Sequence, residues 1–194
     1  MIPVRPLFSA ATITATLLAS SIALSESITL PANSPLKDGQ VTEEEMASIL
    51  SAAQTQLVRL TDEATKAYRG QLTDARPNMP SAWMLMKDGT TVKRISLGEQ
   101  GAEVPASARI YMYRAAIKAI AQGGEINAAA ILYTGRVSEG SEVEALVIEH
   151  EHRLGVSANK VIGFTVDGNE LRWSEPVSQS KPFEWFYDGD SRKG

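Results

Sequence analysis

The sequence predicts an α+β fold: one twisted antiparallel sheet of five to six strands with two helices packed on it, preceded by a signal peptide. Three observations support this prediction. Two segments repeat apolar residues at the three- and four-residue spacing of an amphipathic helix. Short apolar runs bounded by glycine-containing turns stand between and after these segments, as in antiparallel sheets. The N-terminus has the composition of a secretory leader.

The predicted secretory signal peptide covers residues 1–25. Arg5 is its only charged residue, and an uncharged stretch from Leu7 to Leu24 leads to a small-x-small cleavage pattern that ends at Ser25. An uncleaved membrane anchor is the alternative, because this stretch is just long enough to span a bilayer. Its serine and threonine content favours cleavage. We therefore expect a periplasmic or secreted protein that is not stably inserted in a membrane.

The remaining chain divides into three parts. Residues 26–41 contain two prolines and a glycine and are expected to form an extended leader. Residues 42–175 are expected to form a single α+β domain, since their length fits one hydrophobic core. Residues 176–194 form a C-terminal tail that is rich in aromatic residues.

The first predicted helix starts with a capping box, in which Thr42 precedes three glutamates. Its apolar residues alternate four- and three-residue spacings up to Gly70: Met46, Leu50, Ala53, Leu57, Leu60, Ala64 and Ala67. This heptad pattern would also suit a coiled coil with a second subunit. The flanking positions carry almost none of the charge pairs that specify coiled-coil partners, which favours packing on the protein's own sheet.

A hairpin and a second helix follow. Ser81–Lys87 and Thr90–Leu97 flank Asp88-Gly89, a strong hairpin signal. In Ser107–Gln122, one stripe is apolar and the opposite face is polar, and Gly123-Gly124 supplies a helix stop. The apolar stripe consists of Ile110, Tyr113, Ile117 and Ile120, and the polar face of Arg114, Lys118 and Gln122.

Two strands then form the predicted centre of the sheet. In Ile126–Thr134, alternation places Ile126, Ala128, Ala130 and Leu132 on one face and Ala129, Ile131 and Tyr133 on the other. The return strand, Glu142–Arg153, has Leu146, Ile148, His150 and His152 on one face and Glu149 and Glu151 on the other. A loop at Leu154–Asn159 and strands at Lys160–Val166 and Glu170–Ser174, joined by a turn at Asp167-Gly168-Asn169, complete the domain.

Composition excludes several functions. The chain has no cysteine, so it has no disulfide, thiol nucleophile, cysteine-ligated zinc or lipid-anchoring cysteine. Its net charge of −4 and the lack of a basic stripe argue against nucleic acid as a partner. It lacks the Gly-x-Ser-x-Gly elbow, a glycine-rich phosphate loop and His-Glu-x-x-His. We therefore expect no catalytic residues and no cofactor, and interpret the protein as a non-enzymatic accessory or binding module for an envelope protein or a small ligand.

A metal-binding protein or metal-dependent hydrolase is the alternative. His150 and His152 are the only histidines, and a strand places both on one face. If Thr134 pairs with Val143, Glu125 lies opposite His152, and these three side chains would supply three ligands of a zinc site with a fourth position for water. The competing interpretation, which we favour, is a solvated strand end, because His-x-His with flanking glutamates also suits exposure to solvent.

The tail contains Phe183, Trp185, Phe186 and Tyr187 within five residues. It would suit a docking peptide that presents aromatic anchors to a partner. We favour the interpretation that it folds back on its own domain, because free aromatic side chains would promote aggregation.

Overall fold

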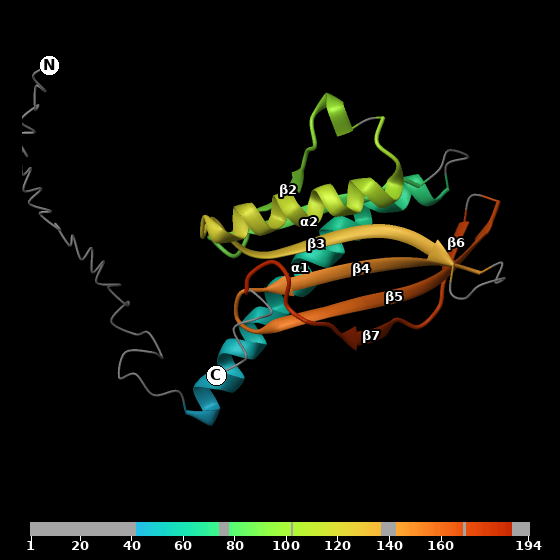
Figure 1. Ribbon diagram of the computed structural model, residues 1–194. Coiled ribbons are helices and arrows are strands. Elements are labelled where there is room, and N and C mark those ends of the chain that lie inside the picture. Colours follow the sequence, from blue (N-terminus) through green and yellow to red (C-terminus); the bar gives the residue numbers. More distant parts are fainter. Residues whose placement is uncertain (1–41, 74–77, 102, 137–142, 169, 188–194) are drawn as a thin grey trace, which may run out of the picture. The chain divides into compact units, whose positions relative to one another are not determined.

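The computed structural model describes residues 42–73, 78–101, 103–136, 143–168 and 170–187. These residues form an α+β fold of one antiparallel sheet and two α-helices (Figure 1). The elements are α1 (Glu43–Leu72), β1 (Ser81–Met86), β2 (Val92–Ile95), a 3₁₀ turn η1 (Glu99–Gly101), α2 (Ala106–Gln122), β3 (Ile126–Arg136), β4 (Glu144–His152), β5 (Val156–Asp167), β6 (Glu170–Trp173) and β7 (Val177–Ser180). The predicted signal peptide and leader lie outside the described residues. None of the described helices is both long and apolar enough to cross a membrane.

The described sheet has seven strands rather than the expected five to six. Its order is β2-β1-β3-β4-β5-β6, and β7 pairs with β5. β5 is 12 residues long, so one edge of it accommodates two short strands: β6 pairs near its C-terminal end and β7 near its N-terminal end. The start of the predicted tail therefore belongs to the sheet.

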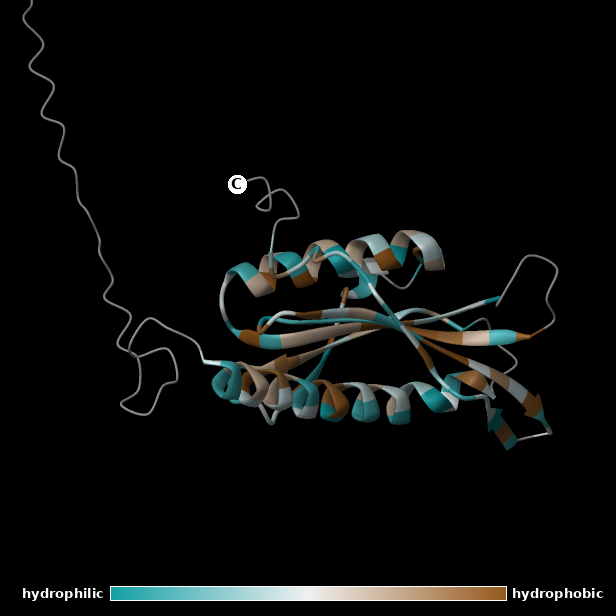
Figure 2. Cartoon of the chain, turned by 90° about the horizontal axis from the view of Figure 1, so that it is seen from below, coloured by the Kyte–Doolittle hydropathy of each residue, from teal (hydrophilic) through white to brown (hydrophobic). Residues whose placement is uncertain are grey.

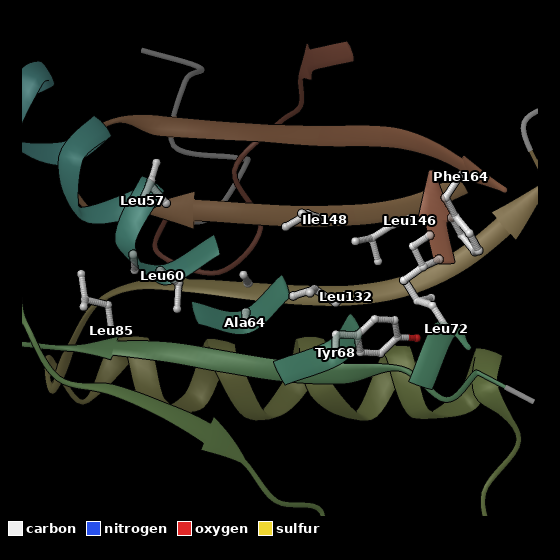
Figure 3. Packing of buried hydrophobic residues seen from close by; sticks show 13 residues of the cluster. Leu57, Leu60, Ala64, Tyr68, Leu72, Leu85, Leu132, Leu146, Ile148 and Phe164 are labelled. Carbon is white, nitrogen blue, oxygen red and sulfur yellow. The ribbon is translucent and has the colours of Figure 1, made fainter. Parts of the chain in front are cut away.

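The two helices cover opposite faces of the sheet (Figure 2). On one face, α1 packs against β1, β3, β4 and β5. Figure 3 shows Leu57, Leu60, Ala64, Tyr68 and Leu72 of α1 beside Leu132, Leu146 and Ile148 of the sheet, with which they form one buried cluster. On the other face, Tyr113 and Ile117 of α2 pack with Ala82, Ile95, Ala129 and Ile131. β3 is covered on both sides, which accounts for its continuous apolar sequence.

The capping box of α1 forms as predicted: the Glu45 amide donates to Thr42 Oγ1, and the Thr42 amide donates to Glu45 Oε2. The heptad seam is only partly buried. Ala53, Leu57, Leu60 and Ala64 are buried, whereas Met46 and Ala67 are exposed and Tyr68 and Leu72 are buried instead. A straight helix has 3.6 residues per turn, so a strict heptad rotates off the sheet by about 20° per repeat.

A bulge in β3 changes one predicted face. Leu85 pairs with Ala128, but Met86 pairs with Ile126, so Asn127 is an extra residue in β3. A bulge of this kind reverses the alternation beyond it. Ile126 therefore packs on the α2 face with Ala129 and Ile131, and the prediction that it shares a face with Ala128 was wrong.

The register between β3 and β4 differs from the predicted one by three residues. Thr134 pairs with Leu146 rather than Val143, and His152 lies opposite Ala128 rather than Glu125. Because a shift by an odd number exchanges the faces, the predicted register would have put Glu149 and Glu151 beneath α1. In the observed register, Leu146 and Ile148 occupy that place. The hydrophobic faces, rather than the turn, set the pairing.

The connection between β4 and β5 is also shorter than predicted. β5 begins at Val156, so only residues 153–155 form the turn, and the prediction of a loop through Asn159 was wrong. Gly155 has φ +97°, a conformation that residues with a side chain rarely adopt. This glycine allows β4 to reverse tightly into β5.

Candidate functional site

The C-terminal end of β4 is buried. Glu149, Glu151 and His152 are 3%, 0% and 0% exposed. The interpretation of this segment as a solvated strand end was therefore wrong. The predicted alternation holds, because the two carboxylates contact the α2 layer and the tail, whereas His152 contacts α1. Each buried polar group has partners from distant parts of the sequence.

Glu149 forms an ion pair with α2. Arg114 donates from Nε to Oε2 at 3.1 Å and from Nη2 to Oε1 at 2.5 Å, and the Tyr133 hydroxyl donates to Oε1 at 2.9 Å. The hydrogen bond to Glu149 raises the pKa of Arg114, and burial followed by the negative charge of Glu149 raises the pKa of Tyr133. Both carboxylate oxygens are occupied. Arg114, on the predicted polar face of α2, thus fastens this helix to the sheet.

Glu151 binds the C-terminal tail. Its oxygens accept the amides of Glu184, Trp185 and Phe186 at 2.9, 3.0 and 3.4 Å, and Lys181 Nζ lies 2.6 Å from Oε1. Hydrogen bonds from several backbone amides and an ammonium group offset the energetic cost of burying a carboxylate.

This contact fixes the aromatic segment on its own domain, as we favoured from the sequence. Trp185 is 2% exposed in the α2-side core, and Lys181 Nζ lies 4.7 Å from its ring centroid. Phe183 and Tyr187 stack edge to face with their ring centroids 5.2 Å apart.

His152 is a neutral structural histidine. Its Nδ1 accepts the Leu154 amide at 3.1 Å, so Nε2 carries the proton and donates to Gln56 Oε1 at 2.9 Å. Burial, with a smaller contribution from the charge of Arg153, lowers its pKa to about 4. Asn127 also donates to Gln56 Oε1, at 3.2 Å. This network joins α1, the β3 bulge and the end of β4.

The structure does not bring the three predicted metal ligands together. His150 Nδ1 lies 3.3 Å from the carbonyl oxygen of Ile148, both ring nitrogens of His152 are engaged, and Glu125 is exposed and is not the cross-strand partner of His152. Burial lowers the pKa of His150 as well. Within the part of the chain that the structure describes, no group of three or more histidine, aspartate or glutamate side chains could hold a metal ion.

Sequence reasoning missed a cationic pocket at the end of β2. The pocket has a volume of about 350 Å³ and lies where β2, the turn around η1 and α2 meet. Its lining residues are Arg94, Ile95, Ser96, Leu97, Gly98, Gly101, Arg109 and Tyr113. The arginines come from a strand and a helix, and no local spacing relates them. In the sequence, Arg109 and Tyr113 stand one turn apart in the second predicted helix, and this spacing is the signal that could have indicated the pocket.

Two positively charged side chains and a buried tyrosine line this pocket. Tyr113 is 4% exposed, and its burial raises its pKa, but the charges of Arg94 and Arg109 oppose that rise. Arg109 Nη2 also donates to the carbonyl oxygen of Gly101 at 2.5 Å, which holds its guanidinium beside the loop. Guanidinium groups bind carboxylates and phosphates through paired, charge-assisted hydrogen bonds. The pocket therefore has the chemistry of an anion site.

No protein-family model, curated protein or solved structure matches this chain.

Proposed function

We propose that the protein is an exported, non-enzymatic binding module of the cell envelope that captures an anionic group of its ligand in the pocket of Arg94, Arg109 and Tyr113. One observation carries this proposal: two arginines and a buried tyrosine line the same hollow. Phenol and guanidinium groups both donate hydrogen bonds that carboxylate and phosphate oxygens accept. The pattern of residues 1–25 supports export.

The state of the buried ionisable groups supports binding rather than catalysis. A catalytic base needs a free lone pair within reach of a substrate proton. Glu149 and Glu151 have both oxygens occupied by protein donors, and His152 has both ring nitrogens engaged. These residues are accounted for by the packing of α2, the tail and α1 on the sheet.

An NMR titration of residues 26–194 with succinate and with inorganic phosphate tests the proposal. Two charge-assisted hydrogen bonds of about 1.5–3 kcal/mol each are enough for an affinity of about 1 mM, which corresponds to about −4 kcal/mol. We expect saturable shifts of the Ser96, Gly98 and Tyr113 signals, and weaker binding at high salt.

Matched arginine variants provide the control. Arg94→Gln should weaken binding by about tenfold, the effect of losing one guanidinium contact. Arg172→Gln removes an exposed arginine on β6, which is paired with Asp167, and should leave binding unchanged. Shifts that are spread over the surface, or that are equal in both variants, would contradict the proposal.

A further inference from the structure

β2 is an edge strand with outward-facing hydrogen-bonding groups. Among the described residues it pairs only with β1. The Met86 amide donates to the Thr91 carbonyl oxygen at 2.9 Å, and the same register continues through Lys93 and Ile95. Since bonded and non-bonded pairs alternate in an antiparallel ladder, Val92 and Arg94 direct their N–H and C=O groups away from the sheet. Another strand can pair with them.

The positive charge of β2 determines which kind of partner strand can pair with it. Lys93 and Arg94 are exposed neighbours on β2, in a chain whose net charge is −4. Two copies of the protein paired through β2 would place these cations close together, and like charges on an edge oppose such pairing. The same charges attract an acidic strand and fix its position. A second copy is therefore disfavoured, and an acidic partner is favoured.

The edge also leads directly into the cationic pocket, because Arg94 and Ile95 belong to β2 and line the pocket as well. We propose that the ligand is an extended acidic peptide segment of another envelope protein, which adds to β2 as a further antiparallel or parallel strand and places a carboxylate in the pocket. Main-chain hydrogen bonds would supply affinity and the arginines would supply specificity. This inference rests on the proposed function, since it uses the same pocket.

Backbone-methylated peptides test the strand pairing. The probes are an acetylated Glu-Val-Glu-Val-Glu-Val peptide and two derivatives, N-methylated on the odd or on the even residues. In a paired strand only alternate amides face β2. One derivative should therefore bind at least about tenfold more weakly than the parent, because several hydrogen bonds are lost, and the other should bind as the parent does.

A charge reversal tests the selectivity. The double variant Lys93→Glu/Arg94→Glu changes exposed side chains and should keep the thermal melting curve of the wild type. Its affinity for the acidic peptide should fall at least about tenfold, and its affinity for Lys-Val-Lys-Val-Lys-Val should rise. The double variant Lys66→Glu/Arg69→Glu carries the same charge change on the exposed face of α1 and should bind both peptides as the wild type does.

The outcomes separate this inference from the proposed function. Equal binding of both methylated derivatives, or no peptide binding while succinate still shifts Tyr113, would overturn strand addition and leave the anion pocket standing. Absence of both peptide and succinate binding would overturn both. A dimer in sedimentation that dissociates in Lys93→Glu/Arg94→Glu would show that β2 serves a second copy, which also overturns the inference.

Discussion

Replacing Glu151 with glutamine should loosen the C-terminal tail and destabilise the domain. The carboxylate is 0% exposed and accepts hydrogen bonds from three backbone amides of the tail and from the Lys181 ammonium group. Glutamine has the same shape, but it is neutral and replaces one acceptor oxygen with an NH₂ donor. That NH₂ group would face either backbone N–H groups or the ammonium group of Lys181.

The size of the effect follows from these contacts. Removing one partner of a buried ion pair costs about 3–5 kcal/mol, because the other charge stays buried without compensation. The tail can avoid part of this cost by detaching, but detachment exposes Trp185. A tryptophan buries about 150–250 Å², which is worth about 4–6 kcal/mol at 25 cal/mol per Å². The two costs are similar, so we expect a loss of about 3–5 kcal/mol.

Two measurements check this. Urea unfolding of residues 26–194, followed by circular dichroism, gives the change in the free energy of unfolding. Acrylamide quenching in a Trp83→Phe/Trp173→Phe background reports the exposure of Trp185 alone. Glu144→Gln is the matched control, because Glu144 is an exposed carboxylate on the same strand, and its change should stay within about 0.5 kcal/mol.

A small effect would refute this reasoning. If Glu151→Gln lowers the free energy of unfolding by less than about 1 kcal/mol and Trp185 stays shielded, then the carboxylate does not hold the tail. A double-mutant cycle with Lys181→Met separates the ion pair from the amide contacts. We expect a favourable coupling between the two side chains, and a coupling near zero would assign the whole effect to the amides.

Three further predictions concern α1 and the end of β4. Between pH 7 and pH 4.5, His152 alone should lower the free energy of unfolding by roughly 2–3 kcal/mol, because its pKa is lowered to about 4 and the unfolded chain, with an ordinary histidine pKa of 6.5, binds a proton that the folded chain does not. In urea titrations, His152→Gln should lose this part of the slope, and the lowered pKa of His150 should contribute to the slope that remains. Ala64→Leu should cost about 1–3 kcal/mol by overpacking a buried position, whereas Ala67→Leu on the exposed face should change stability by less than about 0.5 kcal/mol, and equal effects would mean that the heptad seam packs as a whole. A chelator should leave the melting temperature of the protein, purified without a tag, unchanged, because both ring nitrogens of His152 are already engaged; a stoichiometric metal lost in His150→Ala would contradict this.

Most elements were predictable because their signals are local. The capping box at Thr42, the Asp88-Gly89 turn and the stripe that includes Tyr113 and Ile117 depend only on residues a few positions apart. The alternation along β4 was also predictable, since a strand has a fixed period of two residues. It separated the histidine face from the carboxylate face correctly.

The candidate pocket was not predictable, because its charges meet only in the folded chain. Arg94 belongs to the second predicted strand of the hairpin, and Arg109 to the first turn of the second predicted helix. They line one pocket with Tyr113 only because α2 packs on the sheet near the end of β2. Spacing along the chain carries no information on such a meeting.

The sequence by itself determined the fold class, the two helices, the first hairpin and the two faces of β4. Only the tertiary structure decided that the helices lie on opposite sides of the sheet, that β3 contains a bulge, and that the charged end of β4 is buried. Local patterns follow from backbone geometry, which every short segment contains. The burial of a charge depends instead on partners such as Arg114 and Lys181, which lie 35 and 30 residues from their carboxylates and approach them only when the layers assemble.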